Sequence, residues 1–199
     1  GEVIVRNVTM IGTPNAITRL GAKPVFVNVE AETLCMDLEI AWKAVTDKTK
    51  GVMLVSANGR FPLKGIDGFI NLCSEYGLIL IEDSAQSLGS FYPDGRHIGS
   101  AGAAGSFSFS TPKIISTGQG GAIITDDDEL NYKIRRMKDF GRSGGGLDIH
   151  DSIGWNYKFT DLQAVVGIEQ MKKLEWRVKR KKEIYSLYKE GLKGLENLF

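Results

Sequence analysis

Short apolar runs rich in β-branched residues alternate along the chain with longer segments whose apolar residues recur at helical spacing. The predicted strands are Glu2–Val5, Pro24–Val29, Gly51–Val55, Leu78–Ile81, Ala104–Phe109 and Gly121–Thr125. The predicted helices are Gly12–Leu20, Leu38–Thr46, Gly65–Tyr76 and Asp126–Phe140, followed by a long helical segment from about Thr160. Because strands and helices alternate, and because the fourth strand is continuously apolar, the pattern predicts an α/β domain with a mostly parallel sheet.

Several residues mark where these elements end. Gly21 and Gly77 follow helical patterns at the place where a left-handed residue commonly closes a helix. Asp126 is suited to cap the helix that follows it, and the glycine-rich segment Gly141–Asp151 indicates a mobile loop. Apolar residues at helical spacing in the last helical segment predict a buried stripe. The members of this stripe are Leu162, Val165, Val166, Ile168 and Leu174.

The composition is that of an ordinary globular domain. The chain has 199 residues, of which 42% are hydrophobic and 25% charged, and its formal net charge is +1. These values argue against a disordered segment and against a nucleic-acid-binding surface. No apolar run reaches the roughly 18 residues that a membrane span needs. The basic cluster Arg177–Lys182 is framed by acidic residues and is typical of a solvated helix face.

The two cysteines indicate a compartment rather than a metal site. Cys35 and Cys73 lie in no metal-binding pattern, and with only two histidines in the chain a zinc site is not expected. We expect both thiols to be free and buried, which favours a reducing compartment and predicts a cytoplasmic protein.

Acidic residues stand at the end of the fourth predicted strand. In open parallel sheets, ligands bind beyond the carboxyl ends of the strands. The strand Leu78–Ile81 leads directly into Glu82 and Asp83, where a carboxylate needs a partner because desolvation is costly. A protonated pyridine nitrogen would be such a partner, whereas an ordinary helix-capping aspartate is the alternative interpretation.

A lysine follows the next strand. Lys113 comes just after alternating small polar and aromatic residues, among which Ser108 and Ser110 offer hydroxyls for a phosphate. A lysine held there could form a Schiff base with an aldehyde cofactor, although a single lysine is more commonly a surface residue. The glycine-rich turn Ser116–Gly121 permits close approach of a ligand or of another chain segment. It matches neither a dinucleotide fingerprint nor a P-loop.

Together these segments resemble the DegT-type family of sugar aminotransferases, which are fold-type I enzymes dependent on pyridoxal 5′-phosphate (PLP). The resemblance rests on Glu82–Gly89, Ser106–Lys113 and Ser116–Gly121, and it extends over nearly the whole chain. Gly154–Gln163 (GWNYKFTDLQ) is similar to a further family segment. The resemblance implies the three-layer large domain of a PLP-dependent aminotransferase, with a mostly parallel sheet.

The resemblance also implies a role for each of five residues. Asp83 would pair with the pyridine nitrogen, and Gln86 would hydrogen-bond the ring hydroxyl of the cofactor. Ser108 would contact the phosphate, while Lys113 would carry the cofactor covalently and move a proton between substrate and cofactor. Asn156 would reach the phosphate in a neighbouring subunit, which implies a homodimer with shared active sites.

The reaction implied by the resemblance is transfer of an amino group, from glutamate, to a nucleotide-linked keto-sugar. A related PLP-dependent dehydratase subgroup has histidine in place of the lysine, so Lys113 favours transamination. A PLP-fold protein without catalytic activity and a nucleotide-binding α/β module without PLP are further alternatives. The chain departs from the family pattern at Arg6, at Ser56–Arg60 and at Met10, where an aromatic residue commonly stacks on the cofactor. These departures bear on the substrate more than on the cofactor.

The resemblance further predicts how the chain is divided. Residues 1–160 would form the PLP-binding large domain without its N-terminal part. Residues 161–199 would form a helical segment leading toward a small C-terminal domain outside this sequence. We therefore expect the chain to be part of a longer protein.

Overall fold

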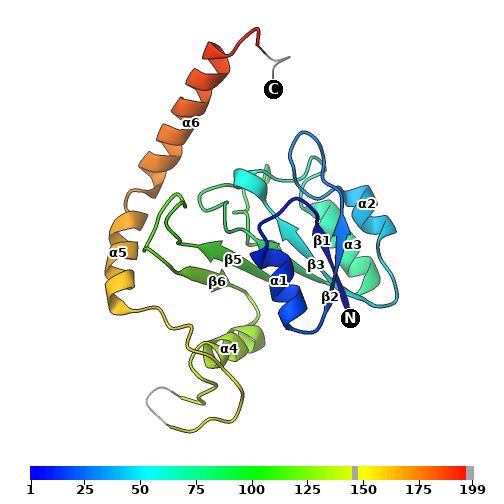
Figure 1. The fold of residues 1–199 in the computed structure, drawn as a ribbon, viewed down its shortest axis with the longest axis vertical. Helices are drawn as coiled ribbons and strands as arrows, with labels where there is room; N and C mark the ends of the chain where they lie inside the picture. Colours follow the sequence, from blue (N-terminus) through cyan, green and yellow to red (C-terminus); the bar gives the residue numbers. More distant parts are fainter. Residues whose placement is uncertain (145–147, 196–199) are drawn as a thin grey trace.

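Six strands form a single sheet in the order β2-β1-β3-β4-β5-β6 (Figure 1). The computed structural model describes residues 1–144 and 148–195. The strands are β1 (Glu2–Arg6), β2 (Lys23–Val27), β3 (Thr49–Val55), β4 (Ile79–Asp83), β5 (Ala104–Ser108) and β6 (Gly121–Ile124). All neighbouring strands are parallel except β5 and β6, which are antiparallel. The predicted mostly parallel α/β sheet is confirmed.

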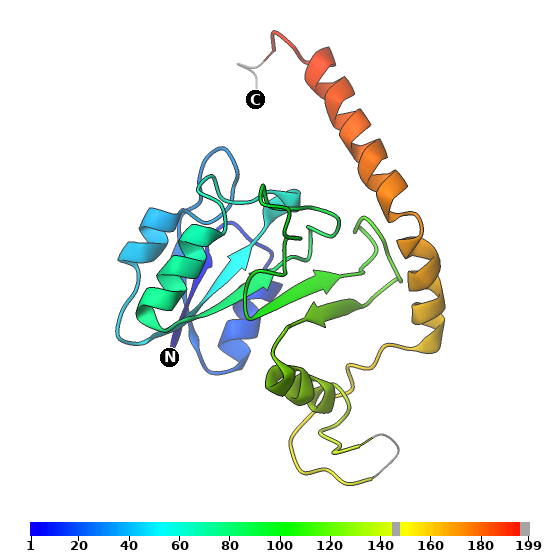
Figure 2. The same cartoon turned by 180° about the vertical axis from the view of Figure 1, so that it is seen from behind.

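Helices cover both faces of this sheet. The α-helices are α1 (Gly12–Arg19), α2 (Leu38–Lys43), α3 (Asp67–Tyr76), α4 (Asp128–Met137), α5 (Asp161–Met171) and α6 (Leu174–Gly191). Helix α1 lies on one face, and α2 and α3 lie on the opposite face, as the two views in Figures 1 and 2 show. The predicted three-layer arrangement is therefore confirmed.

The main core lies between the sheet and helices α2 and α3. Phe69 and Leu72, one helical turn apart in α3, are fully buried, as are Ile4, Val52 and Leu54 on the sheet. Burial of such side chains is the main favourable contribution to folding. Both cysteines are free and buried within the described chain, as predicted.

The helix ends follow the predictions with one correction. Gly77 closes α3 with a left-handed φ of 62°, and Gly21 follows α1 with a φ of 71°. The predicted cap at Asp126 is wrong, because the side chain of Asp127 accepts the bond from the Leu130 N–H at 2.9 Å. The hydroxyl of Thr125 accepts from the Asp127 N–H at 3.1 Å, which places the turn one residue later than expected.

The glycine-rich segment Gly141–Asp151 is only partly described, because residues 145–147 lie outside the described part of the chain. On either side of them, Arg142 and His150 pair as an isolated antiparallel bridge. The mobility of this loop stays a prediction.

The predicted long C-terminal helix consists of two helices, α5 and α6, separated by Lys172 and Lys173. The predicted buried stripe is wrong for this chain: Leu162 is 83% exposed and Val165 is 62% exposed. The reason is position, because α5 and α6 lie beyond the β5–β6 end of the sheet and α6 extends away from it (Figures 1 and 2).

Candidate active site

Asp83 and Ser108 end two neighbouring parallel strands, so both stand at the carboxyl edge of the sheet. Strand β4 ends at Asp83 and β5 ends at Ser108, and Asp83 is in register with Ser106. The Asp83 carboxylate is held in place on both oxygens. Its Oδ2 accepts a hydrogen bond from the Thr13 hydroxyl at 2.6 Å, and its Oδ1 accepts one from the Ala85 N–H at 3.2 Å.

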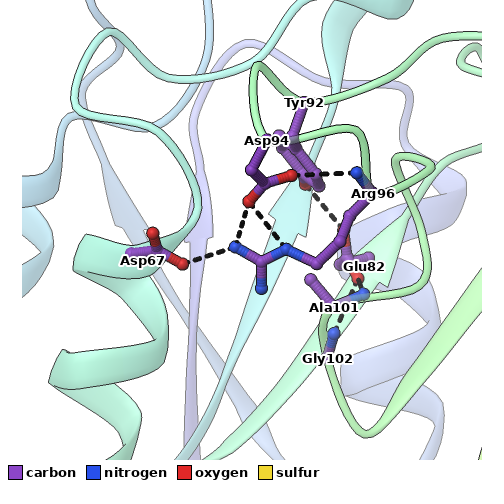
Figure 3. Close-up of polar contacts among 7 residues, drawn as sticks. All are labelled: Asp67, Glu82, Tyr92, Asp94, Arg96, Ala101 and Gly102. Carbon is purple, nitrogen blue, oxygen red and sulfur yellow. Dashed lines mark hydrogen bonds and ion pairs between the residues drawn. The ribbon is translucent and has the colours of Figure 1, made fainter.

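Glu82, the residue before Asp83 in β4, points to the opposite face of the sheet. Successive side chains of a strand point to opposite faces, and Glu82 is fully buried. Its Oε1 accepts from the Tyr92 hydroxyl at 2.6 Å and from the Gly99 N–H at 2.9 Å. Its Oε2 accepts from the backbone N–H groups of Ala101 and Gly102, both at 2.7 Å (Figure 3). Glu82 therefore holds the 92–102 segment in place.

The same segment is tied to α3 from outside. Burial, together with the Glu82 carboxylate, raises the pKa of Tyr92 far above its usual range, so Tyr92 remains a hydrogen-bond donor to Glu82. The Arg96 guanidinium contacts Asp94 and also Asp67 at the start of α3 (Figure 3). Because these ion pairs are largely exposed, the buried Glu82 contacts contribute more to the stability of the segment.

Lys113 lies in a turn that follows β5. Its backbone N–H donates to the Ser110 carbonyl at 3.0 Å. The hydroxyl oxygens of Ser108 and Ser110 lie 3.1 Å apart, next to this turn. On the neighbouring loop after β4, Gln86 Oε1 accepts from the Asn58 N–H at 2.8 Å. The loops after β3, β4 and β5 thus bring these polar side chains to one place.

A cavity of about 650 Å³ joins three of the five predicted site residues, Gln86, Ser108 and Lys113. A volume of this order is typical of small-molecule sites. Asp83 does not line the cavity, but it accepts from the N–H of Ala85, which does. Helix α6 also lines the cavity, through Val178 and the residues one and two turns later.

Asn156 is the one predicted site residue that lies elsewhere. It is exposed and pairs with Asp139 as an isolated antiparallel bridge, and it does not line the cavity. The resemblance predicts that Asn156 reaches the phosphate in a neighbouring subunit. Its place in a single chain does not test this role, which stays a prediction.

The departures from the family pattern have clear local environments. Met10 is 67% exposed, and its sulfur accepts from the Gly12 N–H at 2.9 Å at the start of α1. Arg6 ends β1 and is almost completely buried, with its guanidinium donating to the Leu34 carbonyl. Burial lowers the pKa of Arg6, while the nearby Cys35 and Asp83 oppose that shift.

The glycine-rich turn is approached by other parts of the chain. A Cβ atom on Gly121 would lie 2.6 Å from the Phe107 carbonyl oxygen, and one on Gly120 would lie 2.4 Å from the Phe159 ring. Gly120 also has a φ of 149°, which side-chain-bearing residues rarely adopt. Of the two interpretations of this turn, close approach of another chain segment is the one the structure supports.

Two contributors to the cavity were missed in the sequence. His97 Nε2 accepts from the N–H of Gly89, which lines the cavity, and the His97 ring stands edge-on to Phe91 and Phe107. The pattern of the basic cluster in α6 predicts a solvated face, and its lysines are indeed exposed, but Lys181 and Lys182 also line the cavity. The signal in the sequence is that Lys181 and Lys182 follow the apolar Val178 by three and four residues, which places all three on one face of the helix.

The described residues contain neither a group of three metal-binding side chains nor a helix long and apolar enough to cross a membrane.

Comparison with known proteins identifies the class of this protein. The sequence model of the DegT/DnrJ/EryC1/StrS aminotransferase family matches residues 1–199. The chain belongs to this family.

Individual relatives make the likeness more specific. The chain is 35% identical over 194 residues to the GDP-perosamine synthase of Vibrio cholerae, covering 98% of this chain and 52% of that protein. The solved structure of S. venezuelae DesV has a TM-score of 0.91 and 32% identity, with 98% of this chain and 51% of that chain covered. An E. coli GDP-4-keto-6-deoxy-D-mannose-3-dehydratase with bound hydrated PLP has a TM-score of 0.87 and 26% identity, with 97% and 53% covered. The chain spans about half the length of the relatives it matches.

Proposed function

We propose that this protein is a PLP-dependent aminotransferase that transfers an amino group, from glutamate, to a nucleotide-linked keto-sugar. Family membership and the PLP-bound relative indicate pyridoxal phosphate as the cofactor. The similarity to GDP-perosamine synthases supports a nucleotide-linked sugar as the acceptor. The observation that carries the proposal is the gathering of Lys113, Gln86 and Ser108 around one cavity beside the carboxylate of Asp83.

The Asp83 carboxylate fits a partner with a protonated ring nitrogen. A carboxylate offers about four lone-pair sites, and Thr13 and Ala85 occupy two of them. Those two bonds fix the orientation of the carboxylate and leave capacity for a further donor. A pyridinium N–H placed there would receive a charge-assisted hydrogen bond.

The other cavity residues fit the remaining groups of the cofactor. The Gln86 amide oxygen already accepts from Asn58, so its NH₂ group is the part that can donate to a ring hydroxyl oxygen. Ser108 and Ser110 present adjacent hydroxyls suited to phosphate oxygens. Lys113 supplies the amine that such a cofactor requires.

When bound, the cofactor supplies an aldehyde that accepts the amino group and a ring that withdraws electrons from the reacting carbon. Asp83 would keep the ring nitrogen protonated through its carboxylate. Lys113 Nζ would hold the cofactor covalently between turnovers and would carry the proton during transfer. Gln86 and Ser108 would fix the ring and the phosphate, so that the reacting atoms remain aligned with Lys113.

We further propose that Asn156 acts in the active site of a second copy of the chain. Asn156 is exposed and lies outside the cavity of its own chain. Close by in sequence, α5 exposes an apolar stripe that includes Leu162 and Val165. Exposed apolar patches of this kind commonly mark a surface that another part of a protein covers.

The buried, unpaired Cys35 and Cys73 favour the cytoplasm as the compartment.

Dehydration of a sugar is the second candidate, because a dehydratase is among the similar structures. The fold alone does not separate the two reactions, since this neighbour and the aminotransferase neighbours share it. Lys113 favours amino transfer, because it offers a primary amine that can hold the cofactor covalently.

The proposal is tested by trapping the cofactor on the protein. The protein is incubated with PLP, reduced with borohydride and digested, and the modified lysine is mapped by mass spectrometry. We expect a pyridoxyl group on Lys113, its loss in Lys113→Ala, and its retention in Lys179→Ala, which changes a lysine outside the cavity. A folded protein that leaves Lys113 unmodified would contradict the proposal. Formation of an amino sugar from glutamate and a keto-sugar nucleotide then separates amino transfer from dehydration.

A further inference from the structure

One face of α6 lines the same cavity as Lys113. The residues from α6 that line the cavity are Val178, Lys181, Lys182 and Tyr185, which we call the α6 stripe. Their spacing is i, i+3, i+4 and i+7, so the four side chains share one face of the helix. Lys179 and Arg180 lie between them in sequence but do not line the cavity. The stripe is therefore set by helix geometry and is not a loose group of surface lysines.

The first turns of α6 are attached to the walls of the cavity. The Arg177 guanidinium donates to the Ile114 carbonyl at 2.8 Å, one residue after Lys113. On the other side, Gly89 packs so closely that a Cβ atom there would lie 3.0 Å from Val178 and 3.5 Å from Leu174. Lys181 follows Arg177 by one helical turn, and Lys182 follows Val178 by one turn. These contacts hold the part of α6 that carries both lysines against the cavity.

The cavity has an unbalanced positive charge. Its lining contains Lys113, Lys181 and Lys182 but no aspartate or glutamate. Within the described part of the chain, neither Lys181 nor Lys182 forms an ion pair. Neighbouring basic residues outside the cavity do pair, as Arg180 does with Glu183 at 3.1 Å. The positive charge on this wall is thus available to a ligand.

We propose that Lys181 and Lys182 bind the diphosphate of the nucleotide-linked substrate. This inference rests on the proposed function for the identity of the ligand. The diphosphate is bonded directly to the sugar, so it must lie one sugar ring away from the carbon that reacts near Lys113. Lysine ammonium groups are common partners of phosphate oxygens, and a positive wall raises the rate at which an anionic substrate arrives. The α6 stripe thereby orients the sugar toward Lys113.

The test uses GDP, UDP and dTDP as probes, with binding to the PLP-loaded protein measured by calorimetry. For an exposed lysine we expect Lys181→Ala and Lys182→Ala each to weaken binding of the preferred diphosphate about twofold to fivefold. The double variant should lose about tenfold, and its affinity should depend less on salt. Lys179→Ala is the matched control on the same helix and should bind like the unchanged protein. Thermal unfolding checks that the variants fold.

Each outcome bears on a separate claim. Unchanged affinity in the double variant would overturn the inference, and so would a loss of affinity in Lys179→Ala equal to that of the cavity lysines. The inference also fails if the protein traps PLP on Lys113 but binds none of the three diphosphates. If Lys113 traps no PLP and yet a diphosphate binds through Lys181 and Lys182, the proposed reaction fails while the anion site stands. Retained pyridoxyl labelling of Lys113 in the double variant would show that the two lysines act on the substrate and not on the cofactor.

Discussion

The first 125 residues bury many of their apolar side chains, whereas the two C-terminal helices leave theirs exposed or only partly buried. In the first region, helix α3 buries Phe69 and Leu72 completely against the sheet. In the second, α5 and α6 contain no buried residue, and Leu162 is 83% exposed. Both regions have regular helices with apolar residues at helical spacing. What differs is whether the chain supplies a surface for the helix to pack on.

This difference assigns separate tasks to the two regions. The sheet with its covering helices is held by a continuous core, and it positions Asp83, Ser108 and Lys113. The C-terminal helices are attached by a few contacts, among them Arg177 with the Ile114 carbonyl and Gln163 with the Gln119 carbonyl at 2.7 Å. Their stability within this chain therefore depends largely on local helix formation.

The largest contrast is expected between core truncations in the two regions. Phe69→Ala should lower the free energy of unfolding by about 3–5 kcal/mol, because it leaves a cavity in a close-packed core. In the separate, unassembled chain, Leu162→Ala should change it by no more than about 0.5 kcal/mol, since that side chain is exposed there. Denaturant titration followed by circular dichroism measures both values. Similar losses for the two variants would mean that Leu162 is buried against some surface even in the separate chain.

A smaller loss is expected from Glu82→Gln. The amide NH₂ group cannot accept, so two of the four donors around Glu82 lose their acceptor, at a cost of about 2–3 kcal/mol. Glu183→Gln, which removes an exposed ion pair with Arg180, is the control and should cost no more than about 0.5 kcal/mol. Chemical unfolding of both variants checks this. A neutral Glu82→Gln would show that the buried carboxylate is not needed to hold the 92–102 segment.

The most local effect is expected at the contact between the two regions. Gly89 has a φ of 81° and abuts Val178, whereas Gly95 has a φ of 90° with nothing near its Cβ position. Alanine at either position should cost about 1–2 kcal/mol of backbone strain. Only Gly89→Ala should also push α6 away and speed hydrogen exchange of the α6 amides. Mass spectrometry of deuterium uptake distinguishes the two variants.

Equal exchange of α6 in the Gly89 and Gly95 variants would show that α6 is not held by its contact with Gly89. In that case other contacts would have to hold the α6 stripe at the cavity.

The sheet and the polar loops could be predicted because their signals are local. The continuously apolar Leu78–Ile81 run and the acids after it identify a buried strand that ends at a ligand-binding edge. The strand pattern alone does not show which of the two acids faces the site. Glu82 and Asp83 differ only in which face of the strand they occupy, and only the folded chain shows that Glu82 binds the 92–102 segment.

The C-terminal region was harder to predict because the same pattern of residues has two meanings. A stripe of apolar residues indicates a buried face but does not say which molecule buries it, as Leu162 demonstrates. A basic cluster indicates a solvent-exposed helix face, yet Lys181 and Lys182 line a cavity whose other lining residues outside α6 are at least 67 residues away in sequence. Such long-range neighbours cannot be read from spacing along one helix.

The Glu82 contacts also bear on the order in which the molecule assembles. Their partners lie only 10, 17, 19 and 20 residues further along the chain. Closing short loops has a low entropic cost and favours rapid folding, whereas β1 must find β3 across more than 40 residues. We therefore expect residues 79–102 to form an early folding nucleus, in which the carboxylate selects one conformation of the segment before the rest of the sheet closes around it.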